Sequence, residues 1–257
     1  MQMIHLFQAN FRKQVIELKR YAPNMIAQFV TIYIIFMGMF YGIQFLGSPE
    51  TQGMTIQYTI ISYIFWYLSL NIANQMGYEI YAETSRGTFE QLGMSPSGLW
   101  KILSMRLIST ILLNLIAITL LLYLSMQTTG ETLNIDLISV LPIFIVTCIS
   151  MFGLSFMIAG LSIILKQIQA FLQIFQFVLA GLSFISTNSV LIHLFLPFVK
   201  GLDMIRAIMI GDFHITDFRL IDFIVLLGNG ILYFGIGLAF YLFCERYARS
   251  KGLLGQY

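Results

Sequence analysis

Six long apolar runs separate the charged residues of this 257-residue chain, and they constrain its fold more than any other feature. Each run is compatible with the roughly 20 residues that an α-helix needs to cross a bilayer. With 58% hydrophobic and 10% charged residues, the chain is too apolar for a soluble domain of its length. We therefore expect an all-α membrane protein with one transmembrane domain, residues 1–257, whose spans lie at 24–46, 54–76, 99–126, 137–165, 168–186 and 220–244.

The N-terminal segment, residues 3–20, predicts an amphipathic interfacial helix. On a helical wheel its apolar face holds Met3, Ile4, Phe7, Phe11, Val15 and Leu18. The opposite face holds Arg12, Lys13, Glu17, Lys19 and Arg20. This pattern favours a helix that lies along an anionic membrane surface, although a soluble amphipathic helix shows the same pattern.

The positions of Lys and Arg between the runs predict the topology. Basic residues cluster on one side, at Arg12, Lys13, Lys19, Arg20, Arg86, Lys101, Arg106, Lys166, Arg246, Arg249 and Lys251. The opposite connections begin with Glu50, Glu131 and Asp136 and become basic only from Lys200 onward. Because cytoplasmic loops are enriched in Lys and Arg, we expect a multi-pass protein of the cell membrane with both termini and residues 77–96 in the cytoplasm.

The polar stretch between the second and third runs concentrates charge in a chain that has little. Its charged residues, spaced four, three and four apart, are Glu79, Glu83, Arg86 and Glu90. In one continuous helix that spacing places them on one face. We therefore expect a short helix over residues 79–92 that presents acidic groups outward. Ser95 and Pro96 then fit the N-cap and first position of the next helix.

The segment 190–211 differs from a simple connection. Its first part is apolar but too short to span, and Pro197 interrupts it, which predicts a re-entrant or interfacial hairpin before the last span. A second short helix is expected to follow. There Asp203 lies three residues from both Lys200 and Arg206 and can pair with either. An ordinary extracellular loop is the alternative.

Amides form a stripe in the fifth run, at Gln169, Gln173 and Gln176. Amides in hydrocarbon are expected to face protein or water, so the stripe either lines a pathway, together with the aromatic Tyr63 and Trp66, or forms interhelical hydrogen bonds.

Glycines recur on the sixth run at Gly228, Gly230, Gly235 and Gly237. Small residues repeated on one face permit close helix approach, either within the subunit or at a subunit interface.

Several classes of function are disfavoured. A net charge of +2 without a concentrated basic patch argues against nucleic acid as a partner. His5, His193 and His214 are too scattered for a metal site, and no catalytic cluster is visible, so we expect no catalytic or metal-binding residues. The sequence also lacks the Gly-x-x-x-x-Gly-Lys-Ser/Thr pattern of a phosphate-binding loop. A transporter built on this chain would take its energy from elsewhere.

Taken in order, these elements resemble the permease subunits of type 2 ATP-binding-cassette transporters, which are mostly exporters. The resemblance covers essentially the whole chain. Its most specific part is residues 83–96, ETSRGTFEQLGMSP, which are similar to the coupling element Glu-x-x-x-Gly-Thr-hydrophobic-Glu-x-Leu of that family. Weaker similarity lies in Pro197, Asp203 and Arg206 and in the tail over residues 245–257.

The resemblance implies a division of labour between chains. Two permease subunits, as a homodimer or a paired heterodimer, form the pathway in the membrane lipid, and two separate ATPase subunits bind ATP and Mg. This chain would bind no cofactor itself. The residues that would couple it to the ATPase are Glu79, Glu83, Arg86, Phe89, Glu90 and Leu92, with Phe89 and Leu92 as apolar anchors. An extracellular gate would include Pro197, Lys200, Asp203 and Arg206.

The implied cargo is amphipathic or hydrophobic: a drug, an antimicrobial peptide, a lipid or a lipid-linked glycan. An ion-coupled carrier or channel is the alternative, and an intramembrane enzyme is a third reading. The scarcity of ionisable residues within the predicted spans disfavours both of these.

Overall fold

The computed structural model describes residues 2–46, 52–96, 98–165, 168–186 and 189–251, and these residues form helices and connections without a strand. An all-helical fold was predicted and is confirmed. The elements in chain order are α1 (Gln2–Arg20), α2 (Ala22–Leu46), α3 (Gln52–Ser85), α4 (Phe89–Gly93), α5 (Leu99–Thr129), α6 (Leu137–Leu165), α7 (Gln169–Phe184), α8 (Val190–Phe195), α9 (Val199–Gly211), the 3-10 helix η1 (Ile215–Asp217) and α10 (Leu220–Ser250).

Four helices of the described chain are both long enough and apolar enough to cross a membrane, namely α2, α5, α6 and α10. The chain is therefore a multi-pass membrane protein. Two further predicted spans have weaker support. The predicted span 54–76 lies inside the 34-residue α3, which is long but less apolar, and the span 168–186 corresponds to α7, which has only 16 residues.

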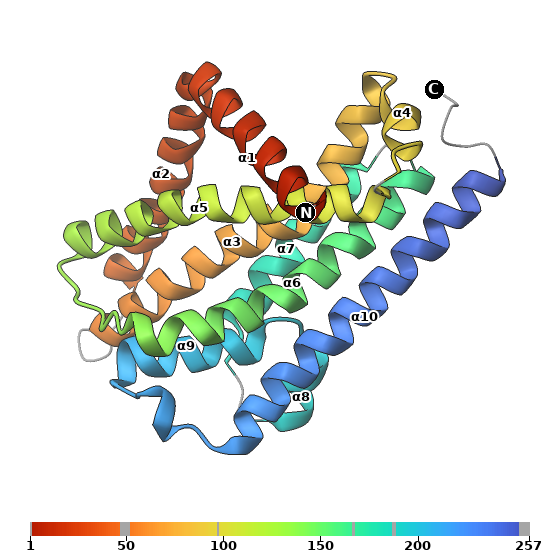
Figure 1. Cartoon of the computed structure of the whole chain (residues 1–257). Helices are drawn as coiled ribbons and strands as arrows, with labels where there is room; N and C mark the ends of the chain where they lie inside the picture. The colour runs from red at the N-terminus through yellow and green to blue at the C-terminus, as the bar shows by residue number, and fades with distance from the viewer. Residues whose placement is uncertain (1, 47–51, 97, 166–167, 187–188, 252–257) are drawn as a thin grey trace.

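Helix α6 lies at the centre of the fold, between α10 on one side and α3 on the other (Figure 1). Helix α3 in turn contacts α5 and α7, while α1 lies across α5. Helices α1 and α2 form a V at one end of the molecule, and α8 and α9 lie at the opposite end (Figure 1). The structure thus separates two ends, joined by long apolar helices.

Glycines allow α6 and α10 to approach each other backbone to backbone. A Cβ atom added to Gly237 would lie 2.1 Å from the carbonyl oxygen of Gly153, and one added to Gly153 would lie 2.1 Å from that of Tyr233. Gly230 also faces α6, whereas a Cβ on Gly235 would meet nothing within 4 Å. Packing within the subunit, one of the two predicted uses of these glycines, is therefore confirmed for Gly230 and Gly237.

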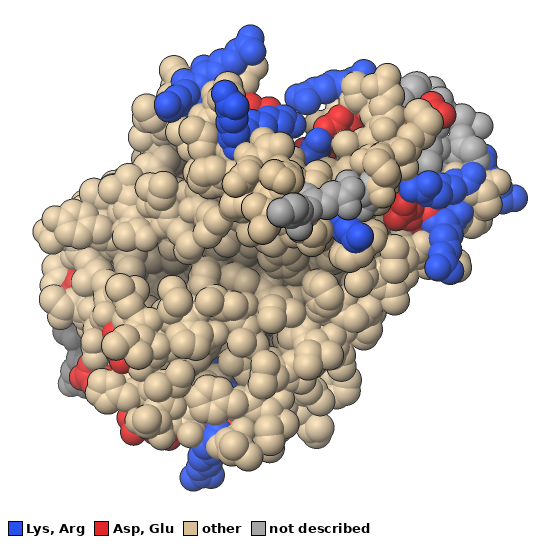
Figure 2. Space-filling view, in the orientation of Figure 1, with Lys and Arg blue, Asp and Glu red and all other residues tan. Residues whose placement is uncertain are grey.

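Basic residues gather at one end of the molecule. Figure 2 shows Lys and Arg over α1, near α4 and at the end of α10, with a broad uncharged zone beyond them. This is the clustering that the sequence predicted. Glu50 and Lys166, which also entered that prediction, and tail residues 252–257 lie outside the described residues.

The predicted helix over residues 79–92 is wrong in its boundaries. Helix α3 continues to Ser85, a turn containing Gly87 at φ 71° follows, and α4 covers only Phe89–Gly93. Because this left-handed residue changes the direction of the chain, the charged residues before and after it do not share one helix face. The next helix starts at Leu99, as predicted for that span. Its N-cap is Gly98, at φ 80°, rather than Ser95.

Candidate functional site

A buried ion cluster fastens three helices together at the basic end. The Arg106 Nη1 atom on α5 donates to Glu79 Oε2 at 2.7 Å and to Glu83 Oε1 at 2.8 Å, both on α3. Its Nε donates to Asn10 Oδ1 on α1 at 3.3 Å. The Arg106 side chain is only 10% exposed. Buried ion pairs are costly to break, so this cluster holds α1, α3 and α5 in a defined arrangement.

Helix α4 is attached to this cluster and to α10. The Thr88 hydroxyl, immediately before α4, donates to the Glu83 carboxylate. Burial would raise the pKa of Glu83, but the hydrogen bonds from Thr88 and Arg106 outweigh it, and the pKa is lowered. At the other end of α4, Arg249 Nη2 donates to the Gly93 carbonyl oxygen at 3.1 Å. Helix α4 is therefore held at both ends.

Two predicted coupling residues face inward. Glu83 is 8% exposed and Phe89 is 3% exposed, and Phe89 belongs to the hydrophobic core. Leu92 is half-buried and packs against that core, and Glu79 is partly buried in the ion cluster. The expectation that the acidic groups of this stretch all point outward is therefore wrong, because α5 packs against this part of α3 and Arg106 draws Glu79 and Glu83 inward.

The outward surface of α4 and the turn before it is formed by other residues than the inward-facing ones. It includes the exposed side chains Arg86, Glu90, Gln91 and Met94. Met94 is 70% exposed and was not among the predicted coupling residues. Its signal was an apolar residue directly after Gly93, where a short helix ends. We call these four residues the α4 surface.

A second buried cluster centres on Arg206 of α9, at the opposite end of the molecule. Arg206 Nη1 donates to Asp203 Oδ1 at 2.7 Å and to the Ile185 carbonyl oxygen at 2.9 Å. Its Nη2 donates to Ser62 Oγ at 2.7 Å and to the Ser183 carbonyl oxygen. The guanidinium carbon also lies 4.0 Å from the centre of the Tyr58 ring. Arg206 thereby connects α9, α3 and the end of α7.

The partners of Asp203 differ in part from the prediction. Arg206 is one of them, as predicted, and His193 Nε2 of α8 is the other, at 2.9 Å. Of the two possible partners that spacing offered, Lys200 is not used, because it pairs with Asp222 of α10 at 2.6 Å. The helix start at Leu220 explains this, because it brings Asp222 into the first turn of α10, next to α9.

Helices α8 and α9 are folded against the body of the protein. Pro197 between them is buried. Asn229 of α10 donates from Nδ2 to the carbonyl oxygens of His193, Leu194 and Leu196, at 3.1, 2.9 and 2.9 Å. These carbonyls would otherwise lack partners at the end of α8. His193 and Asn229 were not predicted in this role, because their partners lie on other helices.

The predicted pathway residues divide into two groups. Tyr63 is fully buried, and its hydroxyl donates to the Ile32 carbonyl oxygen at 2.6 Å, so it lies in the core and lines no pathway within this chain. Gln169 and Gln173 are exposed on α7, and neither side chain hydrogen-bonds to another described residue. Gln176 is half-exposed. Its backbone carbonyl oxygen accepts a hydrogen bond from Trp66 Nε1 at 3.2 Å. The amide stripe thus lies on the outer face of the subunit.

Labelling with a thiol reagent tests whether water reaches that stripe. We expect Gln173→Cys to react with a membrane-impermeant maleimide faster than Val178→Cys, because an amide in hydrocarbon is expected to face water or protein. Val178 is the control, since it lies on the opposite side of α7 from the amide stripe and is 50% exposed. The native Cys148 and Cys244 are buried and give a low background. Equal protection at both positions would place the stripe against lipid or a partner helix.

Within the described ranges, no group of three or more His, Cys, Asp or Glu side chains is arranged to hold a metal ion. Comparisons with protein-family models, curated proteins and solved structures gave no significant match.

Proposed function

We propose that this chain is the membrane-spanning subunit of an ATP-driven exporter of the cell membrane. In this proposal it has six spans, with α3 and α7 as the two that length and composition leave open, and both termini lie in the cytoplasm. It pairs with a second permease subunit, and separate ATPase subunits supply ATP hydrolysis. The cargo is amphipathic or hydrophobic, in the class of drugs, antimicrobial peptides, lipids and lipid-linked glycans.

The attachment of α4 is the observation that supports the proposal most. A subunit driven by a separate motor needs a surface for the motor and a stiff connection from that surface to the spans. Here the α4 surface is exposed, whereas Thr88, Phe89 and Gly93 connect α4 to the Glu83–Arg106 cluster, to the core and to Arg249. Displacement of α4 would therefore be transmitted to α3, α5 and α10.

The buried and exposed residues of this region then have different roles. Phe89 fixes α4 within the subunit, while Met94 is the apolar side chain available to fill a pocket on the ATPase. The charges of Arg86 and Glu90 would orient the partner, since rim charges act mainly on association rate and partner choice.

Substitution of Met94 tests this assignment. Because a few buried apolar residues usually dominate an interface, we expect Met94→Asp to weaken binding of the ATPase subunit by about 2 kcal/mol, or roughly thirty-fold. The measurement is co-purification of a subunit identified by its phosphate-binding loop, together with its transport-coupled hydrolysis. Gln127→Asp is the control, because it adds the same charge at an exposed position at the far end of α5. Undiminished binding and coupling in Met94→Asp would remove the α4 surface from the mechanism.

An ion-coupled carrier is the second candidate, and one observation favours it. His193, Asp203 and Arg206 form a buried chain of ionisable groups, which is the kind of arrangement that carriers use to move protons. Transport assays in vesicles separate the two candidates. A carrier moves its cargo when the purified chain is alone and an ion gradient is applied, whereas the proposed exporter needs the ATPase subunit and ATP.

A further inference from the structure

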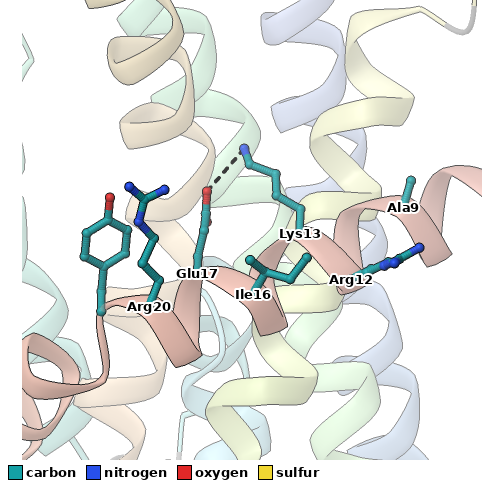
Figure 3. Close-up of a pocket in the computed structure, with 7 residues that line it drawn as sticks. Ala9, Arg12, Lys13, Ile16, Glu17 and Arg20 are labelled. Atoms are coloured by element: carbon teal, nitrogen blue, oxygen red, sulfur yellow. Dashed lines mark ion pairs between the residues drawn. The ribbon is translucent and has the colours of Figure 1, made fainter.

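A shallow groove runs along α1, near the point where it meets α2. Figure 3 shows its basic side chains, Arg12, Lys13 and Arg20, and the carboxylate of Glu17. The Lys13 ammonium lies 3.8 Å from Glu17, but both side chains are more than a third exposed, so this pair is weak. Three cations against one anion leave the groove with excess positive charge.

The groove lies on a face that the fold leaves open. Helix α1 is fixed to α5 through Gln14, whose Nε2 donates to Thr110 Oγ1 at 2.7 Å and to the Arg106 carbonyl oxygen at 3.1 Å, and through Asn10, which accepts from Arg106. The neighbouring Phe11 is half-buried. The lining side chains Arg12, Ile16, Glu17 and Arg20 are exposed, so this face of α1 is open to a ligand.

The position of the groove relative to the membrane follows from the chain itself. The apolar span of α2 begins at Ala22, directly after Arg20 and Tyr21. The C-terminal end of α1 must therefore lie at the boundary between the hydrocarbon and the headgroups. Tyr21, 54% exposed, and Ile16, 55% exposed, add amphipathic and apolar surface between the cations.

We propose that this groove binds the headgroup of an anionic phospholipid. Arg12 and Arg20 are eight residues apart, or about 12 Å along the helix axis. In Figure 3 the Arg12 side chain points away from Arg20, but it is exposed and long enough to turn toward a phosphate held by Arg20, and a guanidinium matches phosphate geometry well. Ile16 then contacts the glycerol or the start of an acyl chain. An acidic protein segment would match the charge but not the exposed apolar side chain at membrane height, so the lipid is the better fit.

The function of the groove is to set the height and angle of the α1–α2 junction in the membrane. The middle of α1 contacts, through Asn10 and Gln14, the same Arg106 that holds α3, so a lipid bound to α1 would also stabilise the helices at the basic end. Lipid binding to this groove requires neither an ATPase nor a transported cargo. A negative result in the lipid-binding experiment would therefore leave the proposed function untouched.

The test compares lipids and matched charge variants of the full chain. Purified protein is titrated with phosphatidylglycerol or phosphatidylcholine in mixed micelles, and bound lipid is counted by native mass spectrometry. The groove variant is Arg12→Gln with Arg20→Gln. The control is Lys19→Gln with Arg246→Gln, which removes two exposed cations outside the groove.

We expect wild type to retain phosphatidylglycerol in preference to phosphatidylcholine, and the groove variant to bind phosphatidylglycerol about thirty-fold more weakly. Each basic residue near an anionic surface contributes about 1 kcal/mol, and two such contributions correspond to that factor. The control is expected to bind like wild type. Equal weakening in the control would show a general effect of net charge and overturn the site. Competition by inorganic phosphate alone, or binding of polyglutamate without binding of phosphatidylglycerol, would also overturn it.

Discussion

Replacing Gly237 by Ala is expected to disrupt the contact between α6 and α10 and to destabilise the protein by about 3 kcal/mol. The added Cβ would lie 2.1 Å from the carbonyl oxygen of Gly153 and 2.8 Å from its Cα atom. These are backbone atoms of a long helix, so they cannot move aside as a flexible side chain could. The two helices would have to separate along the largest interface in the fold, and packing on both sides of α6 would be affected.

The matched control is Gly235→Ala, on the same helix and two residues away. A Cβ at Gly235 meets nothing within 4 Å, and Ala has the higher helix propensity, so this variant should be as stable as wild type or slightly more stable. The midpoint of thermal unfolding of both variants is measured by size-exclusion chromatography in detergent after heating. Equal midpoints for Gly237→Ala and wild type would show that the two helices have room to separate and would contradict the close backbone contact.

Replacing Asp203 by Ala is expected to cost about 3–5 kcal/mol of stability, because it removes the carboxylate partner of the buried Arg206 charge. The exposed fractions of the two side chains are 17% and 6%, so solvent screens the pair little. The loss should also release His193 of α8, the second partner of Asp203. In contrast, Lys200 keeps its partner Asp222, so only the centre of the cluster is affected.

The control for Asp203 is Glu17→Ala, which breaks an ion pair whose side chains are 40% and 49% exposed. Such a surface pair contributes less than about 1 kcal/mol. Denaturation in detergent and transport by reconstituted protein provide the two measurements. An equally small effect of both substitutions would mean that the carbonyl oxygens of Ser183 and Ile185, with Ser62, satisfy Arg206 without its carboxylate. Asp203 would then not hold this cluster together.

Local sequence signals predicted much of the secondary structure. The predicted fourth span, 137–165, coincides with α6, and the span starts at 99 and 220 coincide with the starts of α5 and α10. Apolar length and helix propensity act over neighbouring residues, so they are visible without a fold. Spacing alone also gave Arg206 as one of two possible partners of Asp203, and the structure shows that pair.

The predictions failed where one residue changes the direction of the chain. A helical wheel over residues 79–92 assumes an unbroken helix, but Gly87 adopts a left-handed conformation that ends α3. Phe89 consequently turns into the core, and Met94 takes its place on the exposed surface. No periodicity in the sequence distinguishes these two orientations, because both satisfy the same local pattern.

By itself, the sequence determined that this protein is helical and membrane-embedded, that its basic residues gather at one end and that a short charged element follows the second long helix. Tertiary structure alone decided which charges are buried and with whom. Arg106 meets Glu79, Glu83 and Asn10, and Arg206 meets Ser62, across 23 to 144 residues of sequence. The physical reason is that a buried charge takes its partners from whichever helices the packing places beside it, and that choice is made by the shapes of distant surfaces such as the Gly153–Gly237 contact.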